Sequence, residues 1–290
     1  MTDAIEVRLP FHAPLETADL LGFFARRAVP EVEEVEDETY RRSLRLPHGA
    51  GVVELKPTAM RVNARFWLDD EADLPEASRR SRALLDLDRD PRPVCAALEG
   101  DDLIGPLVRA APGLRVPGTP DPHELAIRAV IGQQISVTGA ATLAGRLVAD
   151  YGERLKRPVW SVTRLFPSAG ALAEADPDRL PMPGARRRAL RSLAAALASG
   201  ELDLHDGADP AGARQRLLAL PGIGPWTAEY IAMRALRDAD AFLPSDLGIR
   251  RALTRLGQDG SAAAAHRLAE RWRPYRAYAF QYLLAATIPA

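Results

Sequence analysis

The sequence contains one cysteine, Cys95, and two lysines, Lys56 and Lys156, among its 290 residues. A single cysteine cannot form a disulfide within the chain or supply the four thiolates of a zinc or iron–sulfur site. No run of about 18 apolar residues is present, so no segment is expected to span a membrane. The N-terminus lacks the basic and then apolar stretches of a secretory signal, which predicts a protein of the reducing cytoplasm.

The charge of the chain is close to balanced in total but not along its length. Residues 1–110 contain 22 acidic and 15 basic residues, a net of −7, whereas residues 111–290 contain 17 and 23, a net of +6. A basic region beside an acidic one is typical of a protein that meets phosphate on one side. The alternative is a chance imbalance on solvated surfaces.

The hydrophobic periodicity changes from strand-like to helical along the chain. Strands are expected at residues 4–9, 32–35, 40–46, 51–57 and 60–67, and helices at 14–28, 79–87 and 93–98. From residue 103 onward the pattern is helical almost throughout, including 123–132, 136–151, 211–219 and 225–236. This predicts an α+β fold: an N-terminal mixed domain with an antiparallel sheet (1–110) and a mostly α-helical core (111–290).

The stretch LPGIGPWTA, residues 220–228, separates two predicted helices. Pro225 occupies the first position of the second helix, where a missing N–H costs nothing. Gly222 and Gly224 allow a sharp turn and leave amide N–H groups exposed at a helix N-terminus, which favours an anion. The hairpin can therefore hold a phosphate without a basic side chain. An ordinary corner between two core helices is the alternative.

An aspartate and two aromatic residues accompany this hairpin. Asp246 lies 22 residues after Gly224 and directly before another predicted helix. Local sequence alone favours a helix N-cap for it, since aspartate is a preferred capping residue. Tyr230 follows Trp226 by four residues, so both rings can face the same side of one helix.

The segments LPGIGPWTAEYIAMRAL and AFLPSDLGIRRAL together resemble the helix-hairpin-helix DNA glycosylases with a Gly/Pro-rich loop and a trailing aspartate. The likeness is strongest to the bacterial DNA-3-methyladenine glycosylase II (AlkA-type) branch. It extends through residues 126–153 and 271–284, and more weakly through LLGFFARRAV at 20–29. The resemblance implies a two-part helical glycosylase core containing a helix-hairpin-helix. It also implies a DNA glycosylase that flips alkylated purines, such as 3-methyladenine and 7-methylguanine, out of DNA for base-excision repair.

By this resemblance, Asp246 is the catalytic carboxylate. Cleaving an N-glycosidic bond builds positive charge on the sugar, which a nearby carboxylate stabilises while it orients or deprotonates a water. Trp226 occupies the position where bifunctional relatives carry a lysine nucleophile, so we expect a monofunctional enzyme without lyase activity. Three alternatives stay open: a glycosylase/lyase, a glycosylase for deaminated or etheno bases, and a non-catalytic DNA-binding protein.

The resemblance also places aromatic residues in a base pocket, formed by Trp226, Tyr230 and Phe23. Electron-rich rings attract a cationic purine, by about 0.5–2 kcal/mol. Leu247 and Leu284 stand where well-known members carry tyrosine and tryptophan, so the lining is less aromatic and the range of lesions is open. Packing of the hydrophobic core is the alternative role for Trp226 and Phe23.

For DNA binding, the resemblance assigns Gln134 as the wedge that fills the gap left by the flipped base. The residues expected to contact DNA are Gln133, Gln134, Gly222, Ile223, Gly224 and Thr227. A cap or a hydrogen-bonding pair between helices is the alternative for the two glutamines.

The backbone carbonyls of Leu218, Leu220 and Gly222 are expected to hold a Na⁺ or K⁺ ion. No other cofactor is required, and neither zinc nor the iron–sulfur cluster of some relatives is expected. The expected partner is double-stranded DNA with alkylated bases, bound by a monomer in the cytoplasm at the nucleoid.

Overall fold

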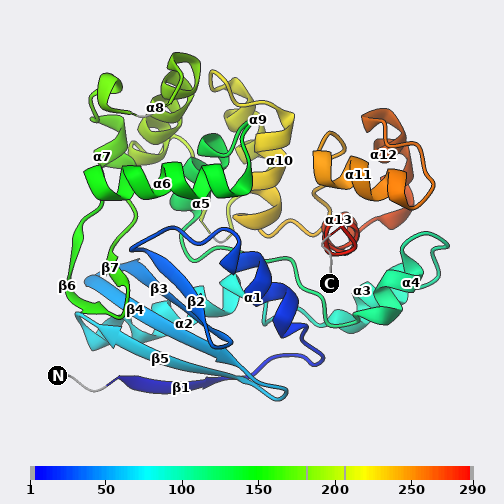
Figure 1. The fold of residues 1–290 in the computed structure, drawn as a ribbon, viewed down its shortest axis with the longest axis horizontal. Helices are drawn as coiled ribbons and strands as arrows, with labels where there is room; N and C mark the ends of the chain where they lie inside the picture. The colour runs from blue at the N-terminus through cyan, green and yellow to red at the C-terminus, as the bar shows by residue number, and fades with distance from the viewer. Residues whose placement is uncertain (1–3, 181, 206, 288–290) are drawn as a thin grey trace.

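A computed structural model describes residues 4–180, 182–205 and 207–287. The N-terminal part forms a five-stranded antiparallel sheet in the order β1-β5-β4-β3-β2 (Figure 1). The strands are β1 (Ile5–Leu9), β2 (Glu33–Glu36), β3 (Thr39–Leu46), β4 (Gly49–Pro57) and β5 (Val62–Leu68). Each strand lies within two residues of its predicted bounds, and the predicted antiparallel sheet is confirmed.

Two helices, α1 (Thr17–Ala25) and α2 (Leu74–Leu84), pack on this sheet. Phe24 of α1 lies against Tyr40 of β3, with ring centroids 4.8 Å apart, inside the hydrophobic cluster of the sheet. Helix α2 begins five residues before the predicted start because a 3₁₀ turn, η1 (Glu71–Asp73), leads directly into it. Pro75 stands in its first turn, where proline is well tolerated.

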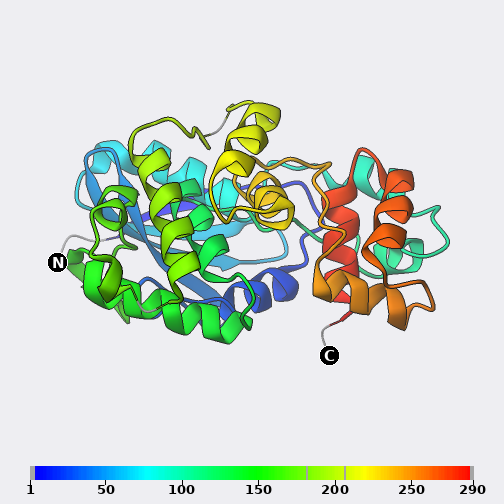
Figure 2. The same cartoon turned by 90° about the horizontal axis from the view of Figure 1, so that it is seen from above.

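The rest of the described chain is mostly helical, as predicted. Its helices are α3 (Pro91–Leu98), α4 (Gly105–Ala110), α5 (Pro122–Ile131), α6 (Val137–Tyr151), α7 (Ala169–Ala173), η2 (Pro177–Arg179), α8 (Gly184–Ala198), α9 (Pro210–Ala219), α10 (Pro225–Arg234), α11 (Leu247–Arg255), α12 (Ala262–Ala269), η3 (Glu270–Trp272) and α13 (Arg276–Ala285). They bury two hydrophobic clusters, one among α5–α9 and one among α11–α13. Helix α10 lies between these groups and contributes to both clusters (Figure 2).

One hairpin departs from the predicted helical pattern. Strands β6 (Arg154–Val159) and β7 (Val162–Arg164) pair with each other and pack over β3 and β4. Leu155 and Val162 join Val52 of the sheet in a small buried cluster. The turn between the strands contains Trp160 at a φ of 51° and no glycine, so the usual sequence signal of a hairpin is missing.

The hydrophobic clusters do not divide at residue 110. Val94 and Leu98 of α3 and Val108 of α4 belong to the cluster of α11–α13 rather than to that of the sheet. The predicted domain boundary after residue 110 therefore stays a prediction. Within the part of the chain that the structure describes, no helix is long and apolar enough to cross a membrane.

Candidate active site

A cavity of about 450 Å³ opens where α1, α5, α6, α10, α11 and α13 meet. Six residues that the sequence assigned to catalysis or to the base pocket line it: Phe23, Trp226, Tyr230, Asp246, Leu247 and Leu284. They come from four helices and one capping position, spread over most of the chain. The fold thus brings the predicted catalytic and pocket residues together in one place.

Asp246 is a helix cap and a cavity residue at once. Its Oδ1 accepts hydrogen bonds from the backbone N–H groups of Gly248 (2.8 Å) and Ile249 (3.2 Å), which caps α11. Its Oδ2 accepts a hydrogen bond from the indole Nε1 of Trp226 at 2.9 Å. All three donors are neutral, so they fix the carboxylate without cancelling its charge. A carboxylate held in this way is suited to stabilise a positive charge that develops beside it.

Gly248 has no side chain, and this leaves space beside the carboxylate of Asp246. A Cβ at this position would lie 2.7 Å from Cδ2 of Leu284 and 3.1 Å from Oδ1 of Asp246. Leu284 therefore packs closely over the first turn of α11. Leu247, by contrast, is 56% exposed at the rim of the cavity.

The two aromatic residues of α10 form one wall of the cavity. The rings of Trp226 and Tyr230 are stacked, with centroids 5.1 Å apart and planes inclined by 9°. The Tyr230 hydroxyl accepts a hydrogen bond from Nη1 of Arg234 at 2.6 Å. Burial by itself raises the pKa of Tyr230, but the charges of Arg234 and Arg27 outweigh it and lower that pKa below its ordinary value.

Arginines line the same cavity, and the sequence interpretation missed them. The guanidinium carbon of Arg27 lies 3.8 Å from the centroid of the Phe23 ring, and that of Arg234 lies 4.6 Å from it. The sequence spacing could have identified both arginines, because each follows a predicted pocket aromatic by four residues: Arg27 follows Phe23, and Arg234 follows Tyr230. Tyr230 and Arg234 therefore share one face of α10, whereas Arg27 lies in the turn directly after α1, four residues beyond Phe23.

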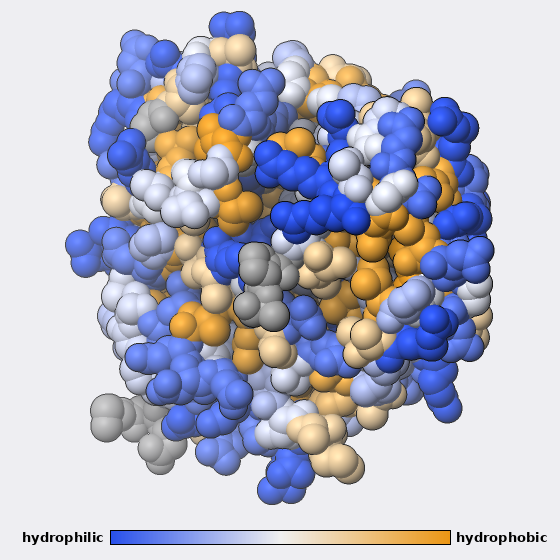
Figure 3. All heavy atoms as spheres, turned by 45° about the vertical axis from the view of Figure 1, so that its right-hand side comes forward, coloured by the Kyte–Doolittle hydropathy of each residue, from blue (hydrophilic) through white to orange (hydrophobic). Residues whose placement is uncertain are grey.

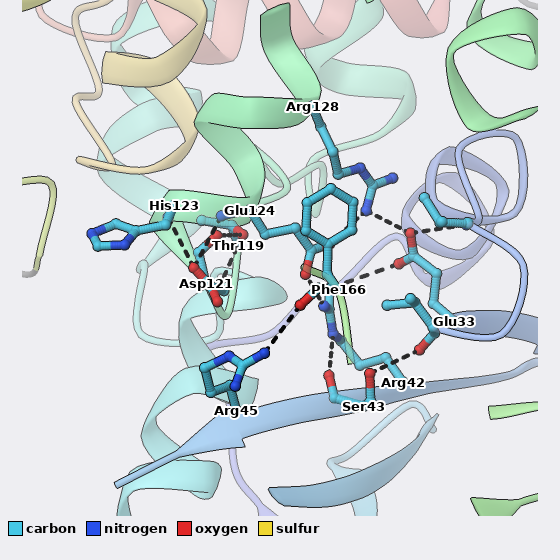
Figure 4. Close-up of polar contacts among 12 residues, drawn as sticks. Glu33, Arg42, Ser43, Arg45, Thr119, Asp121, His123, Glu124, Arg128 and Phe166 are labelled. Atoms are coloured by element: carbon cyan, nitrogen blue, oxygen red, sulfur yellow. Dashed lines mark hydrogen bonds and ion pairs between the residues drawn. The ribbon is translucent and has the colours of Figure 1, made fainter. Parts of the chain in front are cut away.

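A buried ion-pair network fastens α5 to the sheet beside this cavity (Figure 4). Arg42 of β3 donates to Glu124 of α5 at 2.6 Å, and Arg128 of α5 donates to Glu33 of β2 at 2.6 Å. Burial opposes ionisation of Glu33, but the charges of Arg128 and Arg42 keep its pKa below the ordinary value. Arg128 also donates to the backbone carbonyl of Arg27 at 2.6 Å, so the network holds the chain just after α1.

The predicted hairpin is present between α9 and α10. Gly222 has a φ of 77°, and a Cβ there would lie 2.8 Å from the Cβ of Ala189 in α8. Gly224 faces open space, and no side chain among the described residues caps α10. The side chain of Ile223 is buried, which leaves the backbone to face outward. This geometry suits an anion bound by backbone N–H groups.

The loop before α6 lies against this hairpin. Gln133 donates from Nε2 to the carbonyl of Gly222 and to Oγ1 of Thr227, both at 3.0 Å, so it forms the hydrogen bonds between helices that were the alternative to a DNA contact. Thr227 is only 3% exposed. Gln134 is exposed at the tip of the loop with a φ of 59°. Contacts of these residues with DNA stay predictions.

Hydrophobic side chains reach the surface around the cavity. On the face shown in Figure 3, hydrophobic residues form exposed patches among hydrophilic ones. Ile135, Val137 and Leu247 are exposed and line the cavity, whereas Leu218 is exposed on α9. An apolar rim of this kind can contact the sugars and bases of a distorted duplex.

Two of the three carbonyls expected to hold a monovalent cation have hydrogen-bond partners within the protein. The Leu220 carbonyl accepts a hydrogen bond from the Ile223 N–H at 3.2 Å, and that of Gly222 accepts one from Gln133. Each carbonyl oxygen keeps a second lone pair, and such oxygens suit Na⁺ or K⁺. The residues therefore fit an ion. Among the described residues, no cluster of His, Cys, Asp and Glu has a metal-binding arrangement.

Two protein families match the chain in succession. The AlkA N-terminal domain matches residues 6–121, and the family described as HhH-GPD superfamily base excision DNA repair protein matches residues 127–275. The chain therefore belongs to the HhH-GPD superfamily of base excision DNA repair proteins.

Individual relatives agree with this family. The chain is 48% identical to a Mycobacterium tuberculosis protein named probable bifunctional transcriptional activator/DNA repair enzyme AlkA, over 96% of this chain and 56% of that protein. It thus spans about half the length of that relative. It is 38% identical to the Escherichia coli DNA-3-methyladenine glycosylase 2, over 95% of each chain. The structure of a 3-methyladenine DNA-glycosylase from Archaeoglobus fulgidus superposes with a TM-score of 0.81 at 23% identity, covering 98% of each chain, which shows the shared fold.

Proposed function

We propose that this chain is a monofunctional DNA glycosylase that hydrolyses the N-glycosidic bond of alkylated purines in base-excision repair. The observation that carries the proposal is Asp246, a carboxylate fixed by three neutral donors at a cavity lined by stacked aromatic rings. The relatives named as 3-methyladenine glycosylases support the same substrate class.

In the proposed reaction, the damaged base is flipped from the duplex into the cavity beside Trp226 and Tyr230. The bond between C1′ and the base nitrogen breaks, and its electron pair leaves with the base. Asp246 stabilises the resulting positive charge on the sugar, and a water that it orients attacks C1′ and gives up one proton to Asp246, from which it passes to the solvent. An N3- or N7-alkylated purine is already cationic, so it leaves as a neutral molecule without a strong acid to protonate it.

The absence of lyase activity is part of this proposal. A lyase of this family needs an amine that attacks the sugar. Trp226 occupies that position, and its indole instead holds Asp246. Lys56 lies on β4 and Lys156 on β6, and neither lines the cavity.

We also propose that the hairpin binds a DNA phosphate through Gly222 and Gly224, with Gln134 as the wedge. A Na⁺ or K⁺ ion bound by the carbonyls of Leu218, Leu220 and Gly222 would add positive charge beside that phosphate. Because phosphate contacts carry little sequence information, binding should be independent of sequence and weaken with salt. A monomer in the cytoplasm, at the nucleoid, is the simplest form for one cavity per chain.

The experiment is incubation of the protein with methylated duplex DNA, followed by chromatography of released bases and a denaturing gel for strand breaks. The proposal predicts release of 3-methyladenine and 7-methylguanine without breaks, and no trapping by borohydride. Strand cleavage with trapping would show a lyase. DNA binding without any released base would show a non-catalytic binding protein.

A further inference from the structure

The charges that line the cavity are mostly positive. Four arginines line it, whereas Asp246 is the only carboxylate among its lining residues in the described chain. Arg128 is neutralised by Glu33 and Glu124. In contrast, Arg27, Arg234 and Arg251 form no ion pair with any carboxylate of the described residues within 4.0 Å. A cavity shaped only for cationic bases would not be expected to keep unpaired positive charge in its wall.

Arg234 uses its hydrogen-bonding capacity within the protein. Its Nε donates to the carbonyl of Pro117 at 2.7 Å, and its Nη2 donates to that of Gly118 at 2.8 Å. Its Nη1 donates to the Tyr230 hydroxyl. Arg234 is therefore a fixed part of the wall.

Arg27 differs from Arg234 because most of its N–H donors form no hydrogen bond within the described residues. Among the described residues, its guanidinium forms one hydrogen bond, from Nη1 to the Phe23 carbonyl at 3.3 Å. Four of its five N–H donors are therefore unused. Burial lowers the pKa of Arg27 to about 10, so the group stays protonated at neutral pH. The bond from Arg128 to its backbone carbonyl and the contact with the Phe23 ring set its position.

We propose that Arg27 contacts the extruded base and determines specificity, by donating hydrogen bonds to an acceptor on the base edge and thus favouring uncharged bases with an exocyclic oxygen. This inference rests on the proposed glycosylase function and refines its substrate class. Trp226 and Asp246 would favour a cationic base, whereas Arg27 favours a base that is neutral or becomes negative. The two walls would then allow one cavity to accept both classes.

The charge balance of the reaction explains the role of Arg27. When the C1′–N bond of an uncharged base breaks, the electron pair leaves the base with a negative charge. The water oxygen then bonds to C1′, and one proton released from that water neutralises the base. The Arg27 guanidinium stabilises the negative charge before this proton arrives, and it transfers no proton itself. A cationic alkylpurine leaves neutral and gains nothing from this contact.

The test compares Arg27→Gln with the wild type in single-turnover excision from two duplexes. One duplex contains a single hypoxanthine, which is uncharged and carries an exocyclic oxygen, and the other contains a single cationic 7-methylguanine. We expect Arg27→Gln to slow hypoxanthine excision about 10²-fold, as loss of a donor to developing charge does in other enzymes. Excision of 7-methylguanine should change by less than about threefold, since that base leaves neutral.

Two further variants separate a specific contact from a structural effect. Arg27→Lys keeps the charge and should restore part of the hypoxanthine rate. Arg26→Gln changes the exposed neighbouring arginine, which does not line the cavity, and should leave both rates unchanged. An equal fall of both rates in Arg27→Gln would overturn the inference, because it would show a merely structural role.

The outcomes for the wild type separate this inference from the proposed function. Excision of 7-methylguanine without any excision of hypoxanthine would leave the proposed function standing and overturn the role of Arg27. If the wild type excised neither base, the proposed function would fail, and the inference that rests on it would fail too.

Discussion

The two walls of the cavity are built in different ways. The wall of α10 and α11 holds Asp246 with neutral donors and a stacked pair of aromatic rings. The wall of α1 and α5 is held by charges: a buried network joins Glu33, Arg42, Glu124 and Arg128, and Arg27 stands beside it. A carboxylate that must stabilise developing positive charge works best without a cationic partner. The buried ion pairs are placed on the other wall, where they fix the sheet against α5, and the arginines of α10 and α11 that line the cavity form no ion pair with Asp246.

This comparison predicts that changes in the buried ion-pair network of the α1–α5 wall alter stability most, whereas changes around Asp246 on the α10–α11 wall alter the rate. The largest effect on stability is expected for Arg42→Met. The substitution removes a cation that pairs with the buried carboxylates of Glu124 and Glu33. Removing one partner of a buried ion pair lowers the free energy of unfolding by about 3–5 kcal/mol. Chemical denaturation measures this loss. The control is Arg8→Met, at an exposed arginine of β1, and the two variants should differ by most of that amount. Equal stability would show that the network does not hold the wall.

The next effect is expected for Trp226→Phe. It keeps an aromatic ring against Tyr230 but removes the indole N–H that donates to Asp246. A hydrogen bond to a charged group contributes about 1.5–3 kcal/mol, so excision should slow by roughly 10- to 100-fold with little change in unfolding free energy. Single-turnover kinetics and denaturation on the same preparation check both parts. A loss of stability with an unchanged rate would reverse the contrast between the walls.

The smallest effect is expected from acid. Since the folded-state pKa of Glu33 lies below its unfolded value of 4.5, its ionisation favours folding above that pH. This contribution is lost as the pH falls below about 4.5 and through the lower folded-state pKa. The unfolding temperature should therefore fall less steeply below pH 4.5 in Glu33→Gln than in the wild type. Parallel curves would show that Glu33 does not contribute to the acid sensitivity.

The sequence predicted the α10–α11 wall better than the α1–α5 wall. Trp226, Tyr230 and Asp246 lie in one short motif, so local spacing and the family resemblance were enough to place them together. Arg42 and Glu124 are 82 positions apart, and only the folded sheet brings them into contact. The β6–β7 hairpin escaped prediction because its turn contains no glycine. Gln133 forms hydrogen bonds with the hairpin, which was the alternative that the sequence left open, and its contact with DNA stays a prediction.

The most direct test of the account is the effect of Asp246→Asn on excision of 7-methylguanine and on DNA binding. Asparagine also caps helices well, so the fold should be kept. A matched control is Asp209→Asn, because Asp209 caps α9 through two backbone N–H groups and does not line the cavity. The account predicts that Asp246→Asn slows excision by about 10³-fold, or about 4 kcal/mol, while the dissociation constant for DNA changes by less than about threefold. Asp209→Asn should behave as the wild type. Excision by Asp246→Asn at the wild-type rate would contradict the assignment of Asp246 as the catalytic carboxylate.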